Sequence, residues 1–193
     1  MTRPSDISRT FAELIVDTTW DRLPERVRHE AKRSILNFMA TALAGCREDA
    51  VEHTLASLAA FSGVEQATVI GRTERVDALS AAFLNAASGN VFDFDDTHLR
   101  TVIHPTAPVL PALFALAELR PVSGRELLLA FALGVEIECR VGNAISPEHY
   151  ARGWHITSTC GCLGAAAAAG KLLSLDADQL IWSLGSAATQ TGG

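Results

Sequence analysis

The chain has 193 residues, of which 48% are hydrophobic, 20% charged and 6% aromatic. This length is enough for one sizeable domain, and the composition excludes a disordered chain. The formal net charge is -6 and lysine and arginine form no cluster, which argues against nucleic acid as a partner. No run of about 18 uncharged apolar residues occurs, so we expect no membrane-spanning helix. Few aromatics and many small residues favour closely packed helices.

Neither the N-terminus nor the cysteines indicate secretion. Met1 to Asp17 contains acidic residues and lacks the apolar core of a signal peptide. The four cysteines match neither a paired zinc pattern nor a dense disulfide framework. We therefore expect a cytoplasmic protein whose thiols stay reduced and pack as small hydrophobes.

The first half of the sequence predicts four helices. Three show apolar residues at helical spacing, and they cover Ile7 to Thr18, Pro24 to Gly45, and Asp49 to Phe61. Pro24 suits the first position of its helix because its missing N–H is not needed there. Ala67 to Ile70 is predicted as a strand fragment or an extended link. Asp77 is expected to cap a fourth helix, which ends at residues 88–90.

The second half predicts four more helices. They cover Pro105 to Leu119, Glu126 to Val141, Thr159 to Leu173, and Ala177 to Ala188. Pro108 and Pro111 should confine the first to its later turns, and residues 142–154 should form a loop. Ser123 with Glu126 predicts a capping box, and Asp176 predicts a cap. The small residues of G-C-L-G-A-A-A-A-A-G-K place the third helix deep in a bundle.

The helix from Glu126 to Val141 has a predicted apolar stripe and one predicted surface ion pair. The apolar stripe consists of Leu127, Leu128, Phe131, Val135 and Cys139. Glu136 and Arg140 stand four residues apart and can pair on the exposed side.

The stretch N-V-F-D-F-D-D-T-H-L-R-T-V-I-H, residues 90–104, gathers ionisable side chains beside Ala- and Leu-rich segments, where pKa values can be shifted. An extended backbone would point Asp93, Asp95 and Thr97 to one side. It would point Asp96 and His98 to the other. A carboxylate beside an imidazole suits proton transfer, because it orients the ring and stabilises its charged form. The alternative is a capped, solvated turn.

Two histidines precede expected helix starts. His104 stands before Pro105, where free N–H groups favour bound anions and a neutral imidazole that can act as a base. His155 is followed by Thr157, Ser158 and Thr159, any of which could cap the next helix. Alternatively, His155 only hydrogen-bonds its own loop. The other histidines outside the acidic loop are interpreted as surface residues: His29, His53 and His149.

The aspartates and histidines could also bind Zn, Mn or Fe, since these metals accept carboxylate and imidazole ligands. Their spacing in the sequence matches no established ligand pattern, so we predict no metal.

Three segments together resemble the MmgE/PrpD family. They are D-F-D-D-T-H…H-P-T-A-P-V-L-P-A-L (Asp93 to Leu113), G-W-H-I-T-S-T-C-G (Gly153 to Gly161) and the ending A-A-T-Q-T-G-G. That family includes 2-methylcitrate dehydratase, cis-aconitate decarboxylase and iminodisuccinate epimerase. The resemblance runs from the Pro24 helix to Gly193. It implies an all-α fold, in which residues 1–193 form the N-terminal portion of the family's large helical domain, and the α+β lid domain is absent.

The resemblance also implies a site. Motif matching places Asp93, Thr97, His104 and His155 on the family's site positions, with Asp96 and His98 beside them. We expect His104, His155 and Asp93 to be catalytic, and we expect substrate to be bound by Thr97, Asp96 and His98. The family is cofactor-independent and usually homodimeric, so the implied partners are a small polycarboxylate substrate and a second copy of the chain.

The expected activity is that of a lyase. It would abstract a proton next to a carboxylate of a di- or tricarboxylate, with loss of water or CO2. A cofactor-independent epimerase and a non-catalytic helical fragment are alternatives. The lysines and the tyrosine that the family uses further along are not in this chain, which offers only Arg100 and Arg152 near the acidic loop. Burying a polyanion there is costly, so we expect the 193-residue chain alone to be inactive.

The central hypothesis is geometric. The turns at His104 and His155 should converge with the acidic loop on one shared cavity.

Overall fold

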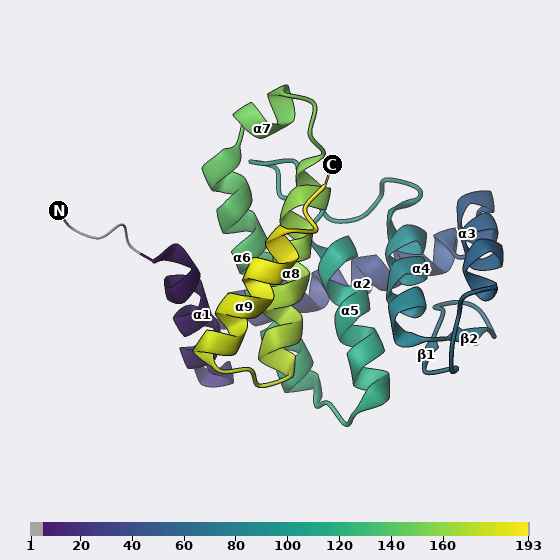
Figure 1. Ribbon diagram of the computed structural model, residues 1–193, viewed down its shortest axis with the longest axis horizontal. Coiled ribbons are helices and arrows are strands. Elements are labelled where there is room, and N and C mark those ends of the chain that lie inside the picture. Colours follow the sequence, from purple (N-terminus) through teal and green to yellow (C-terminus); the bar gives the residue numbers. More distant parts are fainter. Residues whose placement is uncertain (1–5, 193) are drawn as a thin grey trace.

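The computed structural model describes residues 6–192, so expectations for Met1 to Ser5 and for Gly193 lie outside it. Within this range the chain is helical apart from one small ribbon, which confirms the all-α prediction (Figure 1). The helices are α1 (Ile7–Asp17), the 3-10 turn η1 (Trp20–Arg22), α2 (Glu25–Gly45), α3 (Asp49–Ala59), α4 (Ala78–Asn90), α5 (Thr106–Leu119), α6 (Gly124–Ile145), α7 (Glu148–Ala151), α8 (Ile156–Leu172) and α9 (Ala177–Ala188).

The ribbon lies between α3 and α4. Its strands, β1 (Ala67–Thr68) and β2 (Arg75–Val76), are antiparallel, with Ala67 opposite Val76. The predicted extended segment is therefore half of a ribbon. No helix of residues 6–192 combines the length and apolarity needed to cross a bilayer.

The centre of the fold is α8, as its small residues predict. It packs against α5, α6, α9 and α1, and most extensively against α6 (Figure 1). The central core comes from α2, α5, α6 and α8, and its largest buried members are Phe38, Leu110, Leu113 and Phe131. Separate clusters join α3, α4 and the ribbon at one end, and α1 with α9 at the other.

Glycines bring α6 and α8 together. A Cβ atom on Gly134 would lie 2.7 Å from the carbonyl oxygen of Gly164 and 2.8 Å from Cβ of Ala168. Neither backbone nor Ala168 could move without separating the two helices. Close approach therefore requires glycine at position 134, and tertiary contact compensates for its low helix propensity.

The predicted helix caps are present. The Asp77 carboxylate accepts from the N–H groups of Leu79 and Ser80. Ser123 forms a capping box with Glu126. Asp176 caps α9 in the same way, with Gln179 as its partner. The predicted Glu136–Arg140 pair on α6 also forms, at 2.7 Å from Nε to the carboxylate.

Several predicted boundaries are wrong. The α5 helix is regular from Thr106 onward, because Pro108 lies in its first turn, where no N–H bond is needed, and Pro111 is accommodated inside the helix. The predicted loop at residues 142–154 instead contains the end of α6 and the short α7. The helix continues through Gly142 because Ile103 packs against this glycine. The α2 helix begins at Glu25, with Pro24 as its N-cap.

The start of α8 also differs from the prediction. The helix begins at Ile156, and His155 is its N-cap residue. Thr157, Ser158 and Thr159 therefore lie in the first turn, and none of them is the cap.

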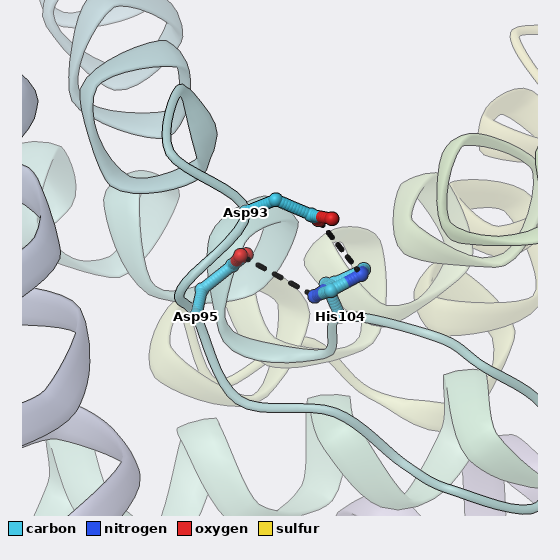
Figure 2. Close-up of side chains that lie close together, drawn as sticks. All are labelled: Asp93, Asp95 and His104. Carbon is cyan, nitrogen blue, oxygen red and sulfur yellow. Dashed lines mark ion pairs between the residues drawn. The ribbon is translucent and has the colours of Figure 1, made fainter.

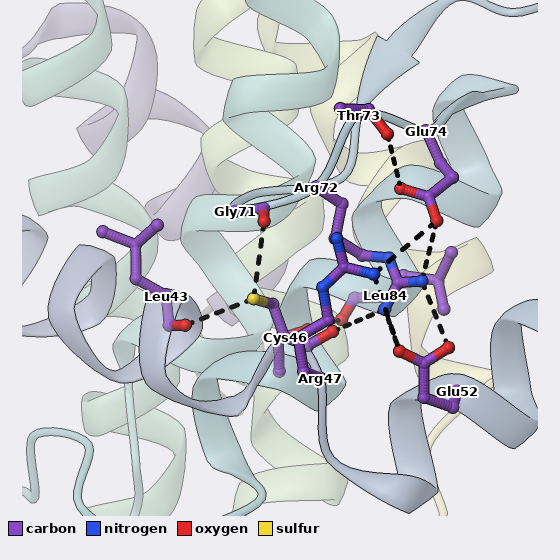
Figure 3. A network of polar contacts seen from close by, with 10 residues as sticks. Leu43, Cys46, Arg47, Glu52, Gly71, Arg72, Thr73, Glu74 and Leu84 are labelled. Atoms are coloured by element: carbon purple, nitrogen blue, oxygen red, sulfur yellow. Dashed lines mark hydrogen bonds and ion pairs between the residues drawn. The ribbon is translucent and has the colours of Figure 1, made fainter.

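The end of α2, the start of α3 and the ribbon turn are joined by one buried guanidinium. Arg72 has a side chain only 3% exposed, and Figure 3 shows it between Glu52 and Glu74. Its nitrogens donate to Glu52 at 2.6 and 3.1 Å, to Glu74 at 2.8 Å, and to the carbonyl oxygen of Cys46 at 2.8 Å. The Arg72 guanidinium lowers the pKa of both carboxyls, that of Glu74 to about 2.

This network predicts a specific acid sensitivity. A carboxyl whose pKa is depressed by folding contributes stability above its ordinary pKa of 4.5, and this contribution is lost as the pH falls towards about 2. Arg72→Met should therefore lower the free energy of unfolding at pH 7 and flatten its decline between pH 4.5 and 2. Urea titrations across this range measure both effects. Arg33→Met, which removes an exposed pair with Glu30, is the matched control. The prediction would be contradicted if the free energy of unfolding fell equally between pH 4.5 and 2 in the wild type and in Arg72→Met.

Candidate active site

His104 lies between two carboxylates at the end of the acidic loop. Its Nε2 atom is 3.4 Å from Oδ1 of Asp93, and its Nδ1 atom is 3.3 Å from Oδ1 of Asp95 (Figure 2). The imidazole is 13% exposed, whereas the Asp95 carboxylate is fully buried and that of Asp93 is 81% exposed. The ring thus has one buried and one solvent-facing carboxylate neighbour.

The loop conformation results from a turn directly after α4. Asp93 has a positive φ of 57°, and its N–H donates to the carbonyl oxygen of Asn90. The predicted extended backbone is therefore wrong at Asp93. The turn still places Asp93 and Asp95 on the same imidazole, while Asp96 points elsewhere, as the alternation predicted for that residue.

Asp95 is the buried member of the cluster. The Asn90 side-chain amide donates to both of its oxygens, at 3.2 and 3.3 Å. Burial raises the pKa of Asp95, and the Asn90 bond and the nearby His104 oppose this increase. Nδ1 of His104 is within ion-pair distance of Asp95 but is not aligned for a hydrogen bond. A small rotation of the ring would make that bond.

A cavity of about 500 Å³ lies beside this cluster, between α4, α5 and the start of α8. Its wall is mainly apolar, and its polar members are Asn90, His155, Thr157 and Ser158. Asn90 also bonds Asp95, and Thr157 also accepts from the backbone N–H of His104 at 3.1 Å. Two wall residues therefore connect the cavity directly to the His104 cluster.

His155 is on the wall of this cavity and is exposed. Its Nδ1 atom is 3.4 Å from Oγ of Ser158, one turn into α8. The segments that carry His104 and His155 touch through Thr157, but the two imidazoles share no hydrogen bond within residues 6–192. His155 lines the cavity, whereas His104, Asp93 and Asp95 do not and adjoin it only through Asn90 and Thr157. A cavity shared by both imidazoles, and their joint action, therefore stay predictions.

The three residues expected to bind substrate have different surroundings. Asp96 accepts from the backbone N–H of Thr106 at 3.2 Å and from its hydroxyl at 2.6 Å, so it caps the start of α5. His98 shares a 2.7 Å bond with the Thr101 hydroxyl. Thr97 is exposed and makes one long bond to the carbonyl oxygen of Asp95. None of the three lines the cavity, and their roles in binding stay predictions.

The remaining histidines separate into two groups. His29 and His53 are exposed, as predicted. His149 is half-buried: its ring bonds the Thr159 hydroxyl at 2.8 Å and stacks on Trp154. The surface interpretation of His149 is therefore wrong, because α7 folds it back onto the start of α8.

Two polar residues next to His104 were not among the predicted site residues. The sequence pattern places Asp95 in the acidic alternation without predicting a role for it, and it places Asn90 at the end of a helix and the start of the acidic stretch. The available signal was the spacing of the two residues: a turn between positions 90 and 95 brings an amide back onto a carboxylate.

Asp93, Asp95 and His104 are also the residues that could hold a metal ion. One ligand-type atom from each lies within 4.8 Å of the others. The nitrogen ligands of this group belong to a single imidazole, whose Nε2 atom faces Asp93 and whose Nδ1 atom faces Asp95. The predicted absence of a metal is not tested by this geometry.

The sequence of the chain matches known proteins over almost its whole length. The model of the MmgE/PrpD N-terminal domain matches residues 9–193. The cis-aconitate decarboxylase-like protein oryM of Aspergillus oryzae is 34% identical over 179 residues, which cover 89% of this chain and 37% of that protein. The cis-aconitate decarboxylase of Aspergillus terreus is 33% identical over 90% of this chain and 36% of its own length. The human cis-aconitate decarboxylase is 34% identical over 96% and 40%.

The chain thus spans 36 to 40% of the length of these relatives. Its helical architecture and the match across residues 9–193 agree with each other. The chain belongs to the MmgE/PrpD family, of which it carries the N-terminal domain.

Proposed function

We propose that the protein is a lyase that acts on a small di- or tricarboxylate, and that decarboxylation is its reaction. The observation that supports this most directly is His104 held between Asp93 and Asp95 beside a cavity that also carries His155. An imidazole oriented by carboxylates can accept and return a proton. The relatives' names favour loss of CO2 over loss of water.

The two imidazoles are the candidates for proton transfer in the proposed reaction. For decarboxylation, the bond to a carboxylate carbon breaks, CO2 leaves, and the electron pair is delocalised over a neighbouring unsaturated carboxylate. A protonated imidazole then supplies the proton that completes the product. For dehydration, one neutral imidazole would remove the proton next to the carboxylate, and the other would protonate the departing hydroxide. Asp93 and Asp95 keep His104 oriented in both cases.

The cavity wall lacks the positive charge that such a substrate requires. None of its described residues is a lysine or arginine. Two or three substrate carboxylates buried against this wall and beside Asp95 would carry a large desolvation cost. We infer that cations from elsewhere in the complete protein complete the site. The homodimer, the cytoplasmic location and the independence of a cofactor belong to the same proposal.

This charge argument gives the first prediction of the proposed function. The 193-residue chain should release CO2 from cis-aconitate no faster than buffer does, whereas the complete gene product should release it catalytically. Both proteins are assayed at equal concentration for CO2 and for water addition or loss. A 193-residue chain as active as the complete product would contradict the inference about missing cations.

The second prediction concerns the two imidazoles. His104→Gln and His155→Gln should each lower kcat of the complete gene product by ~10²–10⁴-fold, the usual contribution of a positioned acid or base. His53→Gln, an exposed histidine on α3, is the matched control and should leave kcat unchanged. Full activity in both cavity-side variants would exclude the proposed proton chemistry.

The third prediction uses the buried carboxyl. Because burial raises the pKa of Asp95, this group gains its proton at a pH above the ordinary value of 3.8 as the solution is acidified. The carboxylate beside His104 is then lost, so kcat should fall on the acid side at a pH above 3.8. Asp95→Asn should lower kcat throughout and remove that limb from the pH profile. Asp21→Asn, at an exposed position, should keep it. An unchanged acid limb in Asp95→Asn would contradict the assignment.

A further inference from the structure

Beneath the candidate site lies a buried carboxyl group that the proposed reaction does not use. Glu138 of α6 has no exposed surface, and neither of its carboxyl oxygens has a hydrogen-bond partner among residues 6–192. Buried polar groups are nearly always hydrogen-bonded, and an ionised one without a partner is very costly. The carboxyl group therefore needs a specific explanation.

The space for this carboxyl group comes from glycine on the facing helix. A Cβ atom on Gly164 of α8 would lie 2.5 Å from Oε2 of Glu138, and one on Gly161 would lie 3.9 Å from it. Gly161 also lines the cavity and packs against Pro108 of α5. Glu138 is thus behind the cavity wall, at the point where α5, α6 and α8 meet.

The surroundings favour the neutral form of Glu138. Burial raises its pKa well above the ordinary 4.5, and the negative charge of Asp96 acts in the same direction. The thiol on the facing helix is also kept neutral: burial, with Glu138 nearby, raises the pKa of Cys160 to about 12. Pro108 and Val109 of α5, which face the same glycines, carry no charge. No described lysine or arginine contributes to the shift of Glu138.

Asp96, whose negative charge also raises the pKa of Glu138, holds the start of α5. Its two oxygens accept from the N–H and hydroxyl groups of Thr106, two residues after His104. One turn beyond Glu138 on α6, Gly142 packs against Ile103, the residue before His104. An ionised Glu138 would repel the Asp96 carboxylate that caps α5. Its hydration would also require water to enter the packed region around residues 103–108.

We propose that Glu138 is a positioning residue for the proposed reaction: as a neutral acid it allows Asp96 to hold the start of α5, and through it to hold His104 between Asp93 and Asp95. Loss of the Glu138 proton, at a pH well above 4.5, releases this arrangement. The assignment to catalysis rests on the proposed function, but the linkage between Glu138 and His104 does not.

The first test is the pH dependence of stability. Above pH 4.5 the unfolded chain gives up the Glu138 proton while the folded chain keeps it, so the stability of the wild type falls as the pH rises towards the folded-state pKa. Glu138→Gln removes this titration. The difference in unfolding free energy between the variant and the wild type should therefore grow steadily with pH above 4.5. Glu136→Gln, on the exposed side of the same helix, is the matched control and should show no such growth.

The second test follows His104 itself by NMR of the 193-residue chain, with its imidazole signals assigned from their loss in His104→Gln. In the wild type these signals should shift a second time as Glu138 ionises, at a pH well above 4.5. In Glu138→Gln only the titration of the imidazole itself should remain. A merely structural Glu138 would leave His104 signals the same in both proteins.

Every outcome of the stability and NMR tests either supports or contradicts the proposed role of Glu138. Parallel stability curves, or His104 signals indifferent to Glu138, would overturn the proposal. If Glu138→Gln does not fold, the wild type still answers the question: with carboxyl-¹³C glutamate, the Glu138 signal should titrate at a pH well above those of the exposed glutamates, in step with His104. A Glu138 signal that titrates with the others would overturn it. None of these readouts needs catalysis, so failure of the proposed lyase activity would be a separate result.

Discussion

The close approach of α5, α6 and α8 is the constraint on which the rest of the structure depends. At Gly134 there is no room for a Cβ atom because the Gly164 carbonyl oxygen and neighbouring methyl groups occupy that space. At Gly164 the Glu138 side chain and a Val109 methyl group occupy it. The starts of α5 and α8 are consequently adjacent, so the N–H of His104 reaches the Thr157 hydroxyl. Wider packing would separate these helix starts and the histidines that precede them. Small side chains in α8 are therefore a requirement of the site as well as of the core.

The acidic loop joins α4 to α5, and different polar residues hold its two ends in place. Asn90 and Asp95 hold one end, and Asp96 holds the other through Thr106. In the middle, His98 pairs with Ile103 across a short bridge. Asp93 and Asp95 both face His104, whereas Asp96 accepts from Thr106, so the three aspartates are not a common anionic patch. Asp93 alone points towards solvent.

Local rules predicted local features well. Asp77, Ser123 and Asp176 cap their helices as expected, because a cap requires only a side chain and the next few N–H groups. The same rules could not locate the C-terminal end of α6 or the start of α8. Gly142 and the hydroxyl residues 157–159 are weak helix formers, and only packing against distant segments such as Ile103 decides their conformation.

The sequence could indicate only part of the candidate site, because the rest depends on packing between distant segments. His104, His155 and Asp93 are indicated by short-range patterns and by motifs. The predicted stripe of α6 is borne out at Phe131, which is buried, and Leu127, Leu128 and Val135 pack against the central core. Past Phe131, however, the buried residues include Gly134, Ile137 and Glu138, and Val135 and Cys139 are only partly buried. The two stripes differ by one residue, and apolar side chains occur on both. Choosing between them requires the position of α8, which the sequence of α6 does not contain.

Electrostatics explain why these acidic groups coexist beside a cavity proposed for an anion. Asp95 has an amide donor and an imidazole, Asp96 has a helix start, and Glu138 has neither but can remain neutral. Each solution removes negative charge from the cavity or compensates it locally. The wall residues themselves are uncharged apart from the titratable His155. The cavity surface of the N-terminal domain is therefore nearly neutral, and the proposed polycarboxylate would need positive charge brought to that surface from outside it.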